Sequence, residues 1–144
     1  MHIDNYPYII RGEVVRGKAI GRRLGMPTAN LKVAPGTDIP THGVYACVAT
    51  VRGREFTGLT NIGTRPTVDD SPVATVETYL FDFAGDLNGD IYDLNGDIYD
   101  ETMEISLQKF IREIRKFGSL DELRSQVRQD EIVAREYFRQ RQKY

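Results

Sequence analysis

The chain has 144 residues, of which 40% are hydrophobic and 28% charged, and its formal net charge is −2. This length predicts one domain that buries a core without a disulfide or a structural metal. The near-neutral charge excludes a general electrostatic attraction to nucleic acid or to membranes.

The single cysteine excludes an intramolecular disulfide and a cysteine-based zinc site. The neighbours of Cys47 are typical of a strand, so we expect a buried, unreactive thiol. The first residues lack the basic and apolar segments of a secretory signal, and no apolar run approaches a membrane span. We therefore expect a cytoplasmic monomer without a nucleic-acid or membrane partner.

A first expected strand, residues 8–15, leads into a basic, glycine-rich segment. Gly17, Gly21 and Gly25 stand four residues apart, with Lys18 and Arg22 between them. Exposed backbone N–H groups and such side chains suit a phosphate group, although the spacing matches neither the dinucleotide fingerprint nor the P-loop. An ordinary barrel loop is the alternative.

The sequence Pro-Thr-Ala-Asn at residues 27–30 ends this segment. In an extended chain Thr28 and Asn30 point to the same side, where their oxygens suit Mg²⁺ bound to nucleotide phosphates. The alternative is a turn closed by an Asx-type hydrogen bond.

Four further segments, residues 43–51, 55–60, 75–83 and 104–111, have the β-branched and aromatic composition of strands. Residues 51–55 are typical of a tight hairpin turn. From composition alone, Glu77 is an outward-facing strand residue. Strands followed by a terminal helix predict an all-β-dominated fold, a closed or nearly closed antiparallel barrel.

Residues 86–99 contain the heptad Asp-Leu-Asn-Gly-Asp-Ile-Tyr twice in succession. Asn-Gly-Asp favours turns, so we expect a duplication or insertion at the tip of a hairpin. An EF-hand calcium loop over residues 93–104 is disfavoured, because Ile98 stands where that loop needs glycine and no helix is expected on either side.

The C-terminal segment predicts an amphipathic helix. Ser119 and Glu122 form a capping box, and apolar residues then recur at helical spacing. Asp130 falls on the apolar stripe. It is either a partly exposed acid at the edge of the helix or an acid that fixes a neighbouring loop.

Several motifs closely resemble those of riboflavin kinases, in the same order and over nearly the whole chain. They are GEVVRG at 12–17, LGMPTAN at 24–30, NIGTRPT at 61–67 and ETYLFDF at 77–83. The resemblance implies a six-stranded antiparallel, Greek-key-like barrel with a C-terminal helix. It implies transfer of the γ-phosphate of ATP to the ribityl 5′-hydroxyl of riboflavin, giving FMN and ADP. It also implies one kinase domain over residues 1–144, without the nucleotidyltransferase of bifunctional FAD synthetases.

The resemblance further implies roles for individual residues. Glu77 would be the catalytic base, and Thr28 and Asn30 would hold Mg²⁺. The nucleotide would bind Gly17, Lys18, Arg22, Leu80, Asp82 and Tyr99, although the duplication leaves Tyr92 as an alternative to Tyr99. The flavin would bind Arg112, Arg115 and Phe117. Asn61 and the turn at residues 65–67 would shape a loop over the site.

Two features depart from the family's pattern. Many riboflavin kinases have proline and then glutamate directly after the arginine, whereas residues 112–117 read Arg-Glu-Ile-Arg-Lys-Phe, and the duplicated heptad lengthens a hairpin that is usually short. Loop-closure entropy grows only logarithmically with length, so we expect the fold to survive. The alternatives to a kinase are a flavin- or nucleotide-binding barrel without turnover, and a calcium-binding or turn-repeat scaffold.

Overall fold

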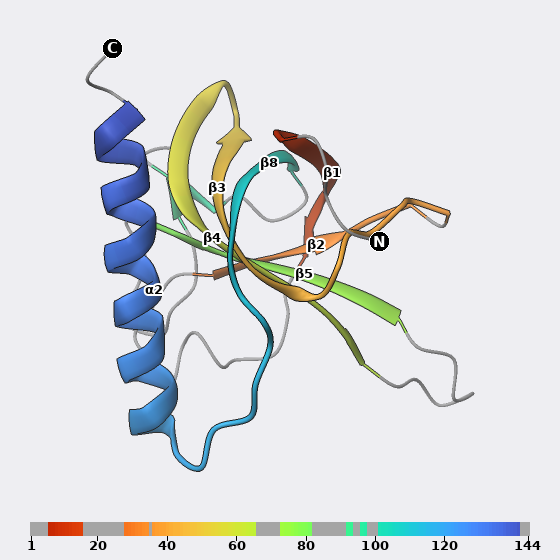
Figure 1. Cartoon of the computed structure of the whole chain (residues 1–144). Helices are drawn as coiled ribbons and strands as arrows, with labels where there is room; N and C mark the ends of the chain where they lie inside the picture. The colour runs from red at the N-terminus through yellow and green to blue at the C-terminus, as the bar shows by residue number, and fades with distance from the viewer. Residues whose placement is uncertain are drawn as a thin grey trace.

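The computed structural model describes residues 6–15, 28–34, 36–65, 73–81, 92–93, 96–97 and 101–141. Six antiparallel strands close into a barrel in the order β1-β2-β5-β4-β3-β8, and one helix lies along its side (Figure 1). The elements of this body are β1 (Tyr8–Val15), β2 (Thr28–Lys32), β3 (Gly43–Val51), β4 (Arg54–Arg65), β5 (Val73–Leu80), β8 (Thr102–Arg112) and α2 (Leu120–Arg141). The predicted six-stranded barrel with a C-terminal helix is confirmed.

Two short strands lie within the duplicated segment. Strand β6 (Tyr92–Asp93) pairs with β7 (Gly96–Asp97) in antiparallel register. This pairing agrees with the expected hairpin, whereas the remainder of residues 86–99, including Tyr99, lies outside the described residues.

The sequence pattern predicted some strands better than others. Strands β1 and β3 begin and end at the predicted residues, but β2 was not among the strands predicted from composition. Because residues 28–32 form a strand between β1 and β5, the interpretation of this segment as a turn is wrong for residues 28–30, and Pro27 lies outside the described residues. Strand β4 also runs beyond its predicted end, since residues 61–65 continue to pair with β5.

The turn between β3 and β4 has the conformation that a two-residue hairpin needs. Arg52 and Gly53 have φ angles of 52° and 73°. Positive φ at both central residues matches the right-handed twist of the flanking strands, and glycine adopts it without steric cost. The predicted hairpin turn is confirmed.

The barrel interior holds the larger apolar core. Side chains from all six strands are buried there, among them Ile10, Tyr45, Ile62, Val76, Leu80 and Ile105. Two buried threonines also face one another, and the hydroxyls of Thr60 and Thr78 lie 2.9 Å apart. The expected burial of Cys47 is confirmed, and burial raises the pKa of its thiol to about 12, which disfavours the reactive thiolate.

Helix α2 packs on the outer face of the barrel through a second apolar cluster. Ala134 of the helix lies buried with Val44, Ala46, Leu59 and Phe81. Strand β3 is consequently buried on both faces, which explains its nearly continuous apolar sequence. In the part of the chain that the structure describes, no helix combines the length and apolar character needed to cross a membrane.

The start of α2 is capped as predicted. The backbone N–H of Glu122 donates to Ser119 Oγ over 3.1 Å, and the N–H of Gly118 donates to Glu122 Oε2 over 2.9 Å. The glutamate therefore bonds the residue before Ser119, a one-residue variation on the capping box. Both bonds satisfy donors that the first turn of a helix leaves unpaired.

Candidate active site

A cavity of about 310 Å³ lies between the outer face of the barrel and helix α2. The barrel contributes one wall, formed by Thr28, Val44, Leu59, Asn61, Glu77 and Tyr79. The segment after β8 and the helix contribute the other wall, which includes Arg115, Phe117, Leu123, Val127 and Asp130. The cavity therefore depends on residues that are far apart in the sequence.

A row of polar side chains crosses the outer face of the sheet at one end of this cavity. Glu77 of β5 is paired with Asn30 of β2 on one side and with Asn61 of β4 on the other. Directly opposite residues of antiparallel strands share a face, so these three side chains lie on the same surface. Thr28 stands two residues before Asn30 and shares that face, as the extended interpretation predicted.

Glu77 is partly buried in this row, and its environment changes its acidity. Burial raises the pKa of the carboxyl group above its ordinary value, and a hydrogen bond with the Thr28 side chain offsets part of that rise. A carboxylate with a raised pKa is a stronger base than an exposed one. The geometry thus provides a proton acceptor at the polar end of the cavity.

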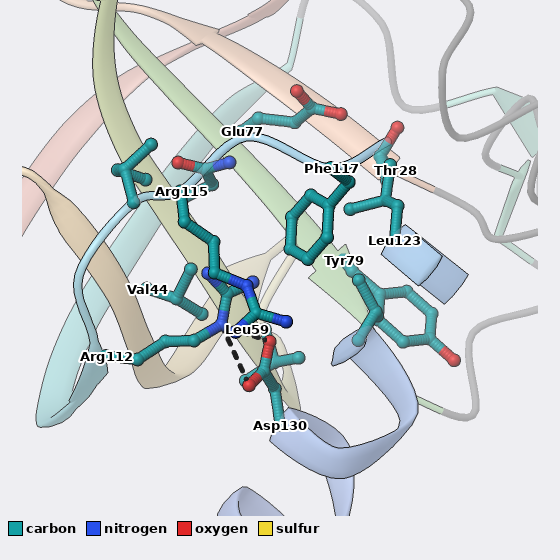
Figure 2. A pocket seen from close by; sticks show the side chains of 13 residues that line it. Thr28, Val44, Leu59, Glu77, Tyr79, Arg112, Arg115, Phe117, Leu123 and Asp130 are labelled. Atoms are coloured by element: carbon teal, nitrogen blue, oxygen red, sulfur yellow. Dashed lines mark hydrogen bonds and ion pairs between the residues drawn. The ribbon is translucent and has the colours of Figure 1, made fainter. Parts of the chain in front are cut away.

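Away from Glu77, the cavity is lined by an aromatic ring and two cations. The guanidinium carbons of Arg112 and Arg115 lie 5.6 and 4.8 Å from the centre of the Phe117 ring. Figure 2 shows Phe117 between the end formed by Glu77 and Thr28 and the end formed by Arg112 and Asp130. This arrangement suits a ligand with a flat ring and a polar extension that reaches Glu77.

Asp130 is buried at the second end and holds Arg112. The Nε of Arg112 donates to both carboxylate oxygens, each 3.0 Å away. Asp130 is only 2% exposed, so the interpretation of this residue as a partly exposed acid is wrong. Arg112 is the last residue of β8, and the alternative in which Asp130 fixes a neighbouring loop agrees with this contact.

Comparison with known proteins identifies the family. Residues 4–138 match the family described as "Flavokinase: Riboflavin kinase". The chain belongs to the riboflavin kinase family. The resemblance found in the sequence motifs is thereby confirmed.

A bifunctional riboflavin kinase/FMN adenylyltransferase of Escherichia coli (strain K12) is 39% identical to the chain over 134 residues. The match covers 92% of the chain but only 39% of that relative. The chain therefore spans well under half the length of this two-activity enzyme.

Two solved structures resemble the chain. One, described as a macrolide-efflux protein from Streptococcus pneumoniae, has a TM-score of 0.76 at 35% identity and covers 90% of this chain and 38% of that chain. A riboflavin kinase from Trypanosoma brucei has a TM-score of 0.61 at 21% identity, with coverage of 96% and 84%. At that identity the second likeness supports the fold alone.

The structure brings several of the predicted riboflavin kinase residues together. Thr28, Glu77, Arg112, Arg115 and Phe117 all line the cavity, and Asn30 lies opposite Glu77.

The other predicted site residues either do not line the cavity or lie outside the residues that the structure describes. Leu80 is fully buried in the barrel interior, so its side chain does not line the cavity. Its predicted nucleotide contact would have to come from its backbone. Outside the described residues lie Gly17, Lys18, Arg22, Asp82 and Tyr99.

Two cavity residues were misplaced or missed by the sequence interpretation. Asn61 was expected to shape a loop, which is wrong, because it lies within β4 and lines the cavity beside Glu77. Tyr79 was assigned no role, although it also lines the cavity. The two-residue period of a strand was the available signal, since Tyr79 must share the face of Glu77.

Proposed function

We propose that this chain is a riboflavin kinase that transfers the γ-phosphoryl group of ATP to the ribityl 5′-hydroxyl of riboflavin, giving FMN and ADP. The observation that carries this proposal is the position of Glu77 in the cavity. It is a partly buried carboxyl with a raised pKa, beside Thr28 and across the cavity from Phe117 and its two arginines.

In the proposed complex the flavin ring packs against Phe117, and the ribityl chain extends toward Glu77. Arginine side chains near the ring can stack on it or donate to its polar edge. As the ribityl oxygen bonds to the γ-phosphorus, the bond from that phosphorus to the bridging oxygen breaks and ADP leaves. Glu77 accepts the proton of the attacking hydroxyl.

The residues beside Glu77 fit the magnesium ion that accompanies ATP. The Thr28 hydroxyl and the Asn30 amide offer hard, neutral oxygens on one face of β2, next to a carboxylate. When bound, Mg²⁺ would neutralise charge on the phosphates. Gly17, Lys18, Arg22, Leu80, Asp82 and Tyr99 remain the predicted nucleotide contacts, and the cytoplasmic, monomeric state remains a prediction.

The direct test is to incubate the purified chain with riboflavin, ATP and Mg²⁺ and to separate FMN from riboflavin by chromatography. We expect FMN only when all three are present. A chain that binds riboflavin but makes no FMN would be a binding module without turnover, and the proposal would be wrong.

Substitution of Glu77 tests its assigned role. Glu77→Gln removes the proton acceptor, and we expect turnover to fall by a factor on the order of 10² to 10⁴ while riboflavin still binds. The matched control is Glu55→Gln, which changes an exposed carboxylate on β4. Turnover of Glu77→Gln equal to that of the control would remove Glu77 from the mechanism.

A further inference from the structure

We infer that Asp130 is a positioning residue that sets the affinity of the cavity for riboflavin by holding Arg112. This inference rests on the proposed function and adds to it a residue of helix α2. Asp130 acts through the segment between β8 and α2, which forms the wall of the cavity opposite Glu77.

Hydrogen bonds fix the orientation of the Asp130 carboxylate. It receives the Nε–H of Arg112 on both oxygens, and Gln126 Nε2, one helical turn earlier, donates to Oδ1 over 2.9 Å. The Asp130 side chain is 3% exposed and that of Arg112 is 18% exposed. Bonds made away from water to an ionised partner are strong and directional.

Arg112 in turn contacts the segment that forms the cavity wall. Arg112 Nη1 donates to the carbonyl oxygen of Glu113 over 3.1 Å, so the guanidinium also fixes the start of the segment. The same guanidinium lies against the ring of Phe117, five residues later. The segment is thus folded around Phe117, with Arg112 anchored at its beginning by the helix.

Asp130 also offsets positive charge beside the Phe117 ring. Arg112 and Arg115 both approach the Phe117 ring, and two neighbouring cations repel one another. Of the two carboxylates that line the cavity, Glu77 belongs to the opposite end, and Asp130 is paired with Arg112. Asp130 therefore offsets one of the two positive charges beside the ring.

The contact is better suited to positioning than to stability. A buried ion pair often contributes no more to stability than well-packed apolar residues would. Helix α2 already has its own attachments, namely the buried Ala134, the hydrogen bond from Tyr79 to Glu131 and the bond from Tyr137 to the Gln108 carbonyl. The distinctive effect of Asp130 is the orientation of Arg112.

Asp130→Asn gives two readouts, one of which does not depend on catalysis. Trypsin cleaves after Arg112, Arg115 and Lys116, all within this segment. We expect faster cleavage there, together with a rise in the riboflavin KM on the order of tenfold, the range for loss of a hydrogen bond to a charged group. The ATP KM and kcat should stay within about twofold, because the lost interaction serves ground state and transition state alike.

Three further variants make the comparison specific. Tyr137→Phe removes a different bond between α2 and β8, the 3.3 Å bond to the Gln108 carbonyl, and should leave the tryptic pattern and riboflavin KM unchanged. Asp130→Glu retains the charge and should recover part of the riboflavin KM. If Asp130→Asn does not fold, Gln126→Leu keeps both charges and should produce a smaller change in the same direction.

An unchanged riboflavin KM in a folded variant would overturn the inference, as would equal rises in the KM values of riboflavin and ATP. Failure of the unaltered chain to form FMN would instead contradict the proposed function. The riboflavin dissociation constant, measured by flavin fluorescence, then takes the place of KM and decides the role of Asp130 separately.

Discussion

Burial of Glu77 has opposite effects on its basicity and on the stability of the fold. Burial beside the cavity raises its pKa, which makes it a better base but makes its ionised form less favourable in the folded state. A carboxyl whose folded pKa lies above its unfolded pKa stabilises the protein fully only below the unfolded pKa. That contribution is lost as the pH rises through the folded pKa.

The pH dependence of stability follows from this sign. We expect Glu77→Gln to melt at a higher temperature than the unaltered chain at pH 8, where the unaltered Glu77 is ionised. The difference should shrink below about pH 4, near the ordinary pKa of glutamate, because both side chains are then neutral. Thermal denaturation at both pH values provides the test, and a lower melting temperature for Glu77→Gln at pH 8 would contradict it.

Thr28 offers an independent check on the acidity of Glu77. Its hydrogen bond lowers the pKa of that carboxyl, so Thr28→Val should raise the pKa further and move the acid limb of kcat/KM to higher pH. The same variant should require more Mg²⁺ for half-maximal rate if Thr28 is a ligand. Thr102→Val, an exposed change on β8, is the control. A shifted pH limb with unchanged Mg²⁺ dependence would limit Thr28 to tuning Glu77.

The sequence motifs predict Glu77 and Thr28 as site residues, but a motif does not say which face of a strand a residue occupies. Glu77 and Tyr79 point outward to the cavity, whereas Thr78 and Leu80 point into the barrel. Strand alternation decides this once one residue is placed. The motif assigned Leu80 to the nucleotide site without regard to strand alternation. Its side chain points into the barrel core, where it does not line the cavity.

Among the strands and the helix, those with strong local patterns were predicted well. Strands β1 and β3 and helix α2 have clear composition, period or caps. Strand β2 has five residues, with threonine, asparagine and lysine among them, and is stabilised by pairing on both sides. Tertiary context therefore created this strand, and strand register placed Asn61 beside Glu77, neither of which composition reveals.

The cap of helix α2 permits a quantitative test of a predicted element. Ser119→Ala removes the acceptor of the Glu122 N–H, so we expect a loss of about 1 kcal/mol of unfolding free energy. Ser125→Ala is the matched control, because this serine is exposed within the same helix, where alanine is the better helix former. The changes in unfolding free energy of the two variants, measured by urea denaturation, should differ in sign or clearly in size. Equal effects would show that the Ser119 hydroxyl does not cap the helix.

The cavity belongs to neither the barrel nor the helix alone. One wall is the outer surface of β2, β3, β4 and β5, and the other is the start of α2 with the segment before it. The fold class could be predicted because most of its elements, though not β2, have a local signature. The cavity could not, because its two walls are brought together by tertiary contacts, among them the packing of Ala134, the pairing of Asp130 with Arg112 and the hydrogen bond from Tyr79 to Glu131.

We therefore expect a bound ligand to contact both walls and to stabilise both of them. In the proposed complex, riboflavin at 100 times its dissociation constant should add about 2.7 kcal/mol to the unfolding free energy, the value for a ligand that binds only the folded state. Hydrogen exchange should slow in peptides from β5 and from residues 113–127, while the pairing of β1 with β8, which forms no part of the cavity wall facing the helix, should change little. Protection confined to β5 would mean that riboflavin binds the barrel without the helix. Protection of both walls would show that α2 and its preceding segment complete the riboflavin site, so that substitutions in the helix can alter binding on the opposite wall.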